Sequence, residues 1–239
     1  VVGWRFQNLK ERWIAAGFIL EEGFPIEKLE RILASMRDAA DEANVCVVTG
    51  DTKVVERGKG DGIFINTTGI GVRDKLFRPG GRKAEPGDAV ILSGTIADHG
   101  LTVLCARGDL GIETNLQSDA APLTEIVESL RKAAPHIHVL RDPTRGGLGT
   151  TLNEIAGQSG VGIEIEDALV PIRPEAASLC EMLGFDPYYV ANEGKMIIIV
   201  PEFEKEPALK AIRGAAYGEN AAVIGHVFKR SQPVVISRT

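Results

Sequence analysis

Residues 139–156 read VLRDPTRGGLGTTLNEIA, which is the pattern of a strand, a glycine turn and the start of a helix. The apolar run Ile137–Leu140 predicts the strand, and Asp142-Pro143 ends it. After Gly146-Gly147 the apolar side chains recur at helical spacing, at Leu148, Leu152, Ile155 and Ala156. Strands and helices alternate in the same way along the rest of the chain, so the sequence predicts an α/β or α+β architecture.

The glycine turn is suited to bind an anion. A helix N-terminus offers free backbone N–H groups and a positive dipole end, and Gly146 and Gly147 let a phosphate approach the backbone closely. Arg145 adds positive charge. Asp142 would repel a bare phosphate, so it is best explained as a ligand of a divalent cation that the phosphate also touches. The alternative is that Asp142 and Thr144 only cap the helix.

Composition excludes several classes of protein. The chain has 239 residues, 44% hydrophobic and 25% charged, with a net charge of -6, which argues against a nucleic-acid binder. No apolar run is long enough to span a membrane, and Val1–Arg12 lacks the apolar core of a secretory signal. The separated Cys46, Cys105 and Cys180 are interpreted as small buried hydrophobes of a reducing compartment, so we expect a cytoplasmic protein.

The chain divides best at the stretch Arg73–Asp88, which is rich in Gly, Pro and charge. We expect two domains, at residues 1–86 and 87–239. The expected strands are Ile14–Leu20, a short buried strand Val45–Val48, Ile63–Ile70, Ala89–Leu92, Val161–Ile165, Met196–Val200, Ala221–Phe228 and Pro233–Ile236. One expected helix begins at Pro25. The others cover Leu101–Ala106, Pro122–Ala134, Pro174–Leu183 and Lys205–Arg213.

Gly50-Asp51-Thr52-Lys53 is a second candidate for a binding site. We expect it to leave a buried strand and enter a loop. A carboxylate, a hydroxyl and an ammonium on consecutive residues can serve magnesium and phosphate together. The alternative is a surface turn followed by a solvated run of charges.

Asn192-Glu193-Gly194-Lys195 is a third candidate. It precedes the strand Met196–Val200, which is apolar on both faces, so Glu193 is expected to be partly desolvated and to have a raised pKa. The alternative is an exposed turn. His99, in Asp98-His99-Gly100, could act on a phosphate or a proton, although a lone histidine more often caps or packs.

Six motifs occur in an order that is highly specific when taken together: Gly17–Gly23 (GFILEEG), Val48–Val55 (VTGDTKVV), Phe64–Thr67 (FINT), Leu92–Thr95 with Asp98–Gly100, Arg141–Gly147 and Asn192–Lys195. In this the chain closely resembles the hydrogenase-maturation carbamoyl dehydratases, the HypE family. That family belongs with aminoimidazole ribonucleotide synthetase, selenophosphate synthetase and thiamin-monophosphate kinase. The match runs from about Trp13 to Thr239.

The resemblance implies two α/β domains and a homodimer around a shared β-barrel. It implies an enzyme that receives a carbamoyl group from the carbamoyltransferase HypF on its own C-terminal cysteine. The enzyme then uses ATP to dehydrate the thiocarboxamide to a thiocyanate and passes the cyanide to the HypC–HypD scaffold complex, for a nickel–iron hydrogenase.

The resemblance also implies roles for single residues. Asp51 and Asp142 are expected to hold Mg²⁺ and ATP, and Lys53 and Glu193 are expected to be the catalytic pair. The further residues expected to bind the nucleotide are Thr52, Arg145, Gly146 and Gly147.

The two ends depart from the family. Val1–Arg12 does not match it, and the chain ends at Ser237-Arg238-Thr239, short of the family's terminal Pro-Arg-Ile-Cys. We therefore expect a fragment that keeps part of the ATP site and does not dehydrate a substrate by itself. Two alternatives remain open: another ATP-dependent kinase or synthetase of the same superfamily, or a non-catalytic scaffold in the maturation complex.

Overall fold

The chain forms two compact units, Asn8–Asp74 and Lys75–Thr239, in a computed structural model that describes residues 9–73, 77–108 and 111–238. Residues 1–8, and residues 74–76 of the expected linker, lie outside the described residues. The two units are described one after the other.

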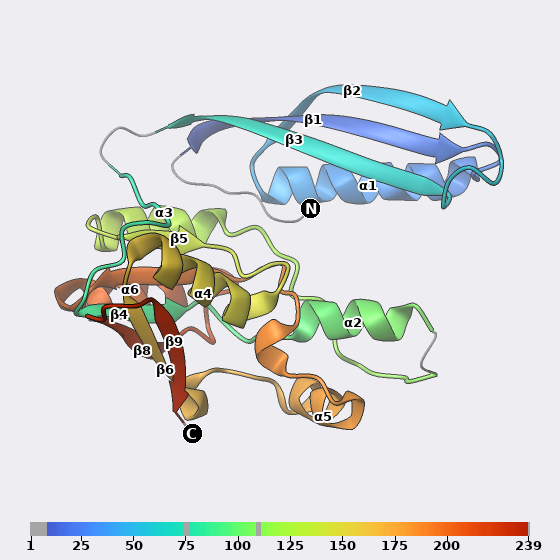
Figure 1. Cartoon of the computed structure of the whole chain (residues 1–239). Helices are drawn as coiled ribbons and strands as arrows, with labels where there is room; N and C mark the ends of the chain where they lie inside the picture. The colour runs from blue at the N-terminus through green and yellow to red at the C-terminus, as the bar shows by residue number, and fades with distance from the viewer. Residues whose placement is uncertain (1–8, 74–76, 109–110, 239) are drawn as a thin grey trace. The chain divides into compact units, whose positions relative to one another are not determined.

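The first unit is a three-stranded sheet with one helix (Figure 1). Its elements are β1 (Leu9–Glu21), α1 (Ile26–Glu42), β2 (Cys46–Val55) and β3 (Ile63–Arg73). The sheet order is β2-β1-β3, with β1 parallel to β2 and antiparallel to β3. Helix α1 is the crossover between the parallel strands, as such a connection requires.

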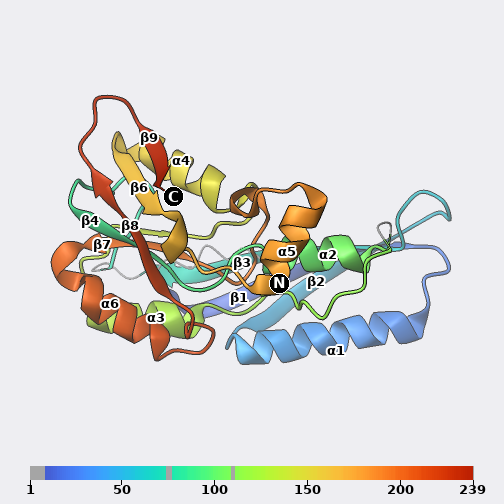
Figure 2. The ribbon, with the colours of Figure 1, turned by 90° about the horizontal axis from the view of Figure 1, so that it is seen from below.

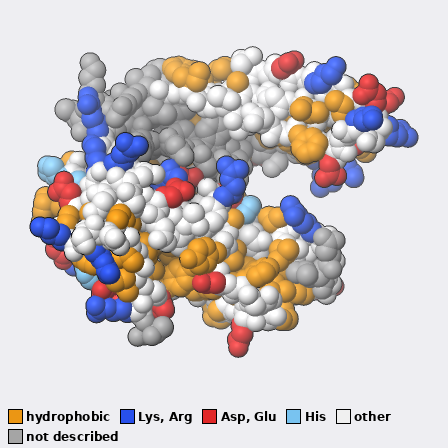
Figure 3. Space-filling model, in the orientation of Figure 1, with side chains coloured by type: hydrophobic (Ala, Val, Ile, Leu, Met, Phe, Trp, Pro, Cys, Tyr) orange, Lys and Arg blue, Asp and Glu red, His pale blue; other side chains and the backbone are white. Residues whose placement is uncertain are grey.

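Helix α1 covers only one face of this sheet. Successive residues of a strand point to opposite faces, and on β1 the side chains of Ile14 and Ala16 are buried. On the other face Trp13 is 36% exposed and Ile19 is 45% exposed. Figure 3 shows hydrophobic side chains at the surface of this unit. The first unit therefore has an open sheet face, defined by the odd-numbered residues of β1 and their register partners.

The strand expected at Val45–Val48 is longer and more exposed than predicted. Strand β2 runs from Cys46 to Val55, and its residues are exposed up to Val54. The pairing with β1 continues through Val55, so Asp51, Thr52 and Lys53 lie within the strand and the predicted loop there is wrong. Because β2 is an edge strand of an open sheet, its apolar residues do not reach a closed core.

The prediction of three buried cysteines is wrong for Cys46. This residue is exposed at the start of β2, whereas Cys105 and Cys180 are buried. Among the described residues all three are free thiols.

The second unit is built on a six-stranded sheet. Its strands are β4 (Asp88–Leu92), β5 (Val139–Arg141), β6 (Gly162–Glu166), β7 (Ile197–Pro201), β8 (Ala222–Phe228) and β9 (Val234–Arg238). The order is β5-β7-β4-β8-β6-β9, and every pair is antiparallel except β6 with β9. In the described parts of the chain neither sheet closes into a barrel.

Helices cover both faces of the six-stranded sheet. Helix α4 (Gly147–Ser159) packs on one face, and α3 (Thr124–Ala133) and α6 (Lys205–Arg213) pack on the other. The unit also contains helices α2 (Asp98–Ala106) and α5 (Pro174–Leu183) and the short 3₁₀ helices η1 (Asp167–Leu169), η2 (Pro187–Tyr189) and η3 (Glu202–Glu204). Figure 2 gives a second view of this arrangement. The helices predicted at Pro174–Leu183 and Lys205–Arg213 are confirmed at both ends. Helix α2 begins at Asp98, earlier than predicted, and α3 begins at Thr124, later than predicted.

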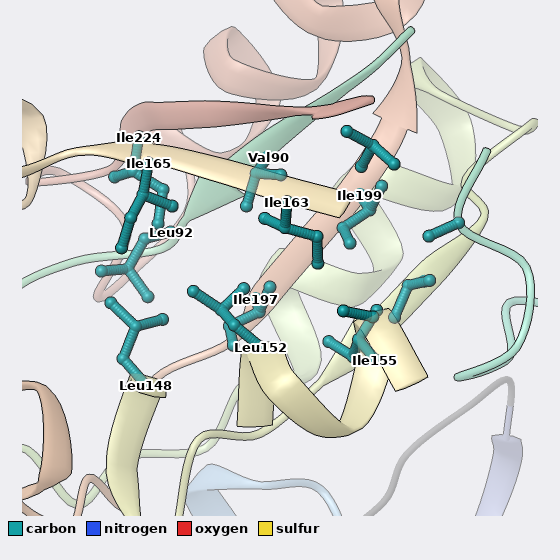
Figure 4. Packing of buried hydrophobic residues seen from close by; sticks show 14 of the residues in the cluster. Val90, Leu92, Leu148, Leu152, Ile155, Ile163, Ile165, Ile197, Ile199 and Ile224 are labelled. Carbon is teal, nitrogen blue, oxygen red and sulfur yellow. The ribbon is translucent and has the colours of Figure 1, made fainter. Parts of the chain in front are cut away.

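The central strands separate two cores. Along β4, Val90 and Leu92 join a cluster with α4, whereas Ala89 and Ile91 join a cluster with α3 and α6. Figure 4 shows the first cluster, in which Leu152 of α4 lies among isoleucines of the sheet. Because both faces are covered, β4 is buried at every position. This matches the continuous apolar runs from which β4 and β7 were predicted.

A third, smaller core joins α2 to α5 through Leu101, Cys105, Ala176, Leu179 and Cys180. It holds the start of α2 against the rest of the second unit. Among the described residues, no helix has the length and apolar character needed to cross a bilayer.

We predict that Leu152→Ala destabilises the protein by about 2–5 kcal/mol, because it leaves a cavity in the α4 core. Leu152 is fully buried in that core. The measurement is urea denaturation followed by circular dichroism. The matched control is Leu169→Ala in η1, where the side chain is 45% exposed and the loss should be small. Equal losses for the two variants would contradict this account of the core.

Candidate active site

The glycine turn between β5 and α4 has the predicted form. Gly146 is the N-cap of α4 with φ of 80°, and Gly147 has φ of 63°, both in the left-handed region that favours glycine. No side chain caps the helix, so the alternative that Asp142 and Thr144 serve as caps is wrong. Asp142 is half-buried and Arg145 is exposed. The turn leaves the Asp142 carboxylate available to a ligand.

Gly147 has a further role that the sequence did not reveal. A Cβ atom at this position would lie 2.4 Å from the carbonyl oxygen of Tyr188 and 2.6 Å from that of Val190. The backbone around η2 is therefore packed directly on the turn. The glycine is required by packing inside the protein, as well as by its left-handed backbone.

Asn192 ties three segments together. Its side chain is fully buried, and its Oδ1 accepts the backbone N–H of Ala97 at 2.8 Å. Its Nδ2 donates to the carbonyl of Pro143 at 3.0 Å and to that of Val190 at 3.0 Å. Asn192 thus connects the glycine turn, the start of α2 and the turn that carries Glu193. The alternative of an exposed turn at residues 192–195 is wrong.

Glu193 has the electrostatic character of a general base. Its side chain is only 13% exposed, and its Oε2 atom is buried without a hydrogen bond among the described residues. Burial raises the pKa of the carboxyl to about 7, and the negative charges of Asp119 and Asp142 act in the same direction. Arg145 lowers it. This confirms the expected desolvation. His99 is the nearest basic group, with its Nε2 3.9 Å from Oε1 of Glu193.

Two residues that the sequence analysis missed support this pair. Ser118 Oγ lies 2.8 Å from Nδ1 of His99. The carboxylate of Asp119 accepts the backbone N–H of Glu193 at 3.2 Å. Both residues lie between α2 and α3, in a described stretch without helix or strand. Periodicity gives no signal there, so only the folded chain reveals them.

The start of α2 holds another buried acid. Asp98 is fully buried, accepts a hydrogen bond from Thr95 Oγ1 at 2.5 Å and lies 3.2 Å from Nε of Arg173. Burial raises the pKa of the Asp98 carboxyl, against the effect of these two partners. Ala97, the N-cap of α2, has φ of 75°, which is uncommon for a residue other than glycine. The hydrogen bond from its N–H to Asn192 holds this backbone in place.

A polar pocket of about 430 Å³ lies beside this cluster. Its lining includes Thr95, Ser118, Asp119, Arg173 and Lys195. Charged and polar groups of both signs therefore face a space next to the turn that carries Glu193.

In the first unit, strand register brings Asp51 and Lys53 to the open sheet face. Asp51 is opposite Gly17, which is opposite Asn66 on β3. Lys53 follows two positions later, so it projects from the same face. Thr52 lies between them and projects from the other face. Gly17, Asp51, Lys53 and Asn66 help to line a shallow pocket of about 390 Å³.

Lys53 and Glu193 lie beside different sheets. Lys53 lies in β2 of the three-stranded sheet, and Glu193 precedes β7 of the six-stranded sheet. Strand pairing therefore does not join the two residues. Within the second unit, the charges of Asp142 and Arg145 do act on Glu193.

Each unit carries a carboxylate of the kind that binds magnesium, Asp51 in the first and Asp142 in the second. Carboxylate oxygens such as those of Asp51 and Asp142 are the hard ligands that Mg²⁺ prefers. Among the described residues no three His, Cys, Asp or Glu side chains form a preassembled metal group.

Known families match both units. The model described as AIR synthase related protein, N-terminal domain, matches residues 7–73, and that described as AIR synthase related protein, C-terminal domain, matches residues 85–238. The expectation that Val1–Arg12 does not match the family is wrong from residue 7 onward, where the first of these models begins to match. The carbamoyl dehydratase HypE of Azotobacter vinelandii is 54% identical over 215 residues, which cover 90% of this chain and 63% of that protein. The chain spans about two thirds of the length of the curated relatives it matches.

Solved structures agree with this assignment. The crystal structure of a HypE–HypF complex matches with a TM-score of 0.92 and 44% identity, over 98% of this chain and 76% of that chain. A hydrogenase maturation protein HypE in complex with ATP matches with a TM-score of 0.91 and 48% identity, over 96% of this chain and 71% of that chain. The chain therefore belongs to the AIR synthase related family and, within it, to the HypE hydrogenase maturation proteins.

Proposed function

We propose that the protein is an ATP-dependent carbamoyl dehydratase. It converts the thiocarboxamide of a C-terminal cysteine to a thiocyanate and so supplies cyanide ligands for a nickel–iron hydrogenase. The named activity of the A. vinelandii relative and the ATP complex of a similar HypE support this proposal.

The observation that carries the proposal is the buried side chain of Asn192. It bonds the carbonyl of Pro143, in the glycine turn, and it is adjacent in sequence to Glu193. A turn suited to phosphate and a carboxyl with a pKa of about 7 are thus fixed to one another within the second unit. Reactions that phosphorylate a group and then remove its protons need both.

The chemistry follows from the poor leaving ability of an amide oxygen. The thiocarboxamide oxygen attacks the γ-phosphorus of ATP, the bond to the bridging oxygen breaks, and ADP leaves. The nitrogen loses its first proton when the oxygen is phosphorylated. It loses the second as the carbon–oxygen bond breaks, which releases phosphate and leaves the thiocyanate. Two protons leave the nitrogen in all, so a base beside it accelerates the reaction.

Glu193 is the proposed base. A carboxyl with a pKa near 7 is half ionised at neutral pH, so it can accept a proton and return it to solvent. Lys53 is its proposed partner in the closed enzyme, where an ammonium keeps the carboxylate ionised and oriented. Lys53 projects from the same face of its sheet as Asp51.

The nucleotide site is proposed to contain Asp51, Thr52, Asp142, Arg145, Gly146 and Gly147. Asp51 and Asp142 would hold Mg²⁺, which neutralises charge on the phosphates of ATP during phosphoryl transfer. Gly146 is the N-cap of α4, so the first N–H groups of that helix belong to the turn, where the dipole favours an anion. Arg145 is exposed and supplies positive charge at the same turn.

The remaining proposals concern assembly. We assign residues 1–86 to the remainder of an N-terminal ATP-binding domain and residues 87–239 to a C-terminal domain. The exposed hydrophobic residues of the open sheet face, such as Trp13, Ile19 and Phe64, support a homodimer in which two such sheets complete a β-barrel. The HypE–HypF complex supports HypF as a partner. The proposal also includes the HypC–HypD complex as acceptor of the cyanide and the cytoplasm as location.

We predict that Asp142→Asn weakens magnesium–nucleotide binding by about 1.5–3 kcal/mol, because it removes one charged contact. Calorimetry with MgATP on the complete protein measures the loss, and thermal unfolding should change little. Asp41→Asn, at an exposed acid in α1, is the matched control. Parental nucleotide affinity in Asp142→Asn would remove Asp142 from the site.

We predict that Lys53→Ala and Glu193→Gln each abolish dehydration in the complete protein while largely sparing ATP binding. The double variant should be little worse than either single variant, because residues that act as a unit are not additive. Single-turnover kinetics with a carbamoylated substrate measure these effects. Losses that multiply would show that the two residues act independently, and near-normal turnover in one variant would exclude that residue.

Without nucleotide, the stability of the protein should depend on the charge of Glu193. The pKa of this carboxyl is raised in the folded state, so the folded state binds the proton more tightly and loses stability as the pH rises from the ordinary value through about 7. Glu193→Gln lacks this penalty. Its melting temperature should therefore gain on that of the parent between pH 5 and pH 8. The control is Glu175→Gln, because Glu175 is an exposed residue of α5. A constant difference across this range would contradict the raised pKa.

A further inference from the structure

Asp119 is a buried acid in a segment without regular structure. Its side chain is 1% exposed, although it lies in the stretch between α2 and α3. Burying a carboxylate costs several kcal/mol unless charged or hydrogen-bonding partners offset the loss of water. A loop residue would ordinarily avoid that cost by facing solvent. The partners of Asp119 therefore show what its burial achieves.

Three contacts of Asp119 fall on the turn at residues 193–195. Its Oδ1 accepts the backbone N–H of Glu193 at 3.2 Å, and its Oδ2 lies 3.6 Å from Nζ of Lys195. Between them, a Cβ atom on Gly194 would lie 1.8 Å from the carbonyl oxygen of Asp119 and 2.8 Å from the backbone nitrogen of Ala121. The loop thus lies directly on residues 193–195, and only glycine fits at the centre.

The carboxylate is held but incompletely satisfied. Oδ2 of Asp119 has no hydrogen bond among the described residues, and the ammonium of Lys195 is farther away than a hydrogen bond allows. Asp119 also lies close enough to Asp98 and Glu193 to raise the pKa of both carboxyls. An arrangement that gathers like charges is unfavourable for folding, and such arrangements concentrate at functional sites.

The neighbouring residue holds the other partner of Glu193. Ser118 Oγ lies 2.8 Å from Nδ1 of His99, whose Nε2 is 3.9 Å from Glu193 Oε1. Consecutive residues of one loop therefore contact the backbone of Glu193 and the ring that faces its carboxyl. The position of this loop sets the position of both groups.

We propose that Asp119 is a positioning residue for Glu193: its buried carboxylate, bonded to the Glu193 N–H and paired with Lys195, fixes the turn that aims the Glu193 carboxyl. The inference rests on the proposed function of Glu193 as a base. Asp119 does not touch the substrate in this role. It acts through the backbone of residues 193–195, so its loss affects turnover rather than nucleotide binding.

The test compares Asp119→Ala, Asp119→Asn and Asn115→Ala in the complete protein. Asp119→Ala removes the acceptor, and a misplacement of about 1 Å at a reacting group costs about 100-fold in turnover. We expect that loss in kcat for dehydration, with unchanged MgATP affinity by calorimetry. Asp119→Asn keeps an oxygen acceptor and should recover most of the turnover. Asn115 lines the polar pocket that Asp119 also lines, and it belongs to the same segment between α2 and α3. Asn115→Ala is therefore the matched control.

A second readout does not depend on activity. Hydrogen exchange of the Glu193 amide, measured by NMR, should become faster in Asp119→Ala and remain near the parental rate in Asp119→Asn and Asn115→Ala. A purely structural role would instead lower thermal stability and MgATP affinity together with turnover. If Asp119→Ala does not fold, Asp119→Val is measured in its place, since it also removes the acceptor of the Glu193 N–H.

The outcomes separate the two proposals. Parental exchange of the Glu193 amide in Asp119→Ala, or parental turnover in that variant, overturns the inference, and the same holds for Asp119→Val where that variant is used. If the parent protein does not dehydrate the substrate but exchange is faster in Asp119→Ala, the proposed function is wrong. The inference that Asp119 holds the turn of Glu193 is then still supported. Reduced turnover together with faster exchange supports both.

Discussion

The second unit depends on the hydrogen bonds of one buried amide. The Asn192 side chain satisfies the N–H of Ala97 and the carbonyls of Pro143 and Val190, three segments that no sheet ladder connects. A backbone group left unpaired in a buried environment costs about 1–3 kcal/mol. No smaller or apolar side chain offers a donor pair and an acceptor at once. Asn192 therefore fixes the position of Glu193 relative to the glycine turn.

Much of the fold could be predicted from the sequence because both faces of the six-stranded sheet are buried. The continuous apolar runs predict β4 and β7, and the helices predicted at Pro174–Leu183 and Lys205–Arg213 match α5 and α6. The prediction failed at β2, where an edge strand of an open sheet gains little from burial, so its extent depends on pairing with β1. Pairing over that distance leaves no local pattern in the sequence.

The candidate site was predictable where it coincides with turns. The backbone of Gly146 and Gly147, and the desolvation of Glu193, follow from glycine chemistry and from the apolar strand after residue 195. Asp119 could not be found in this way. Its burial is caused by close contact between a loop and Gly194, and nothing in the local sequence around residue 119 distinguishes it from a solvated acid. The roles of Lys53, Asp51 and Asp142 remain proposals.

The strand order of the second unit has a consequence for biosynthesis. β4 is buried at every position and occupies the middle of the sheet, yet its two neighbours are β7 (Ile197–Pro201) and β8 (Ala222–Phe228). The chain leaves the ribosome N-terminus first, so this apolar strand emerges long before either neighbour exists. Its unpaired edges and side chains are open to wrong partners throughout that interval. Production of the protein should therefore depend on chaperones that shield nascent chains, and on translation speed between β4 and β8.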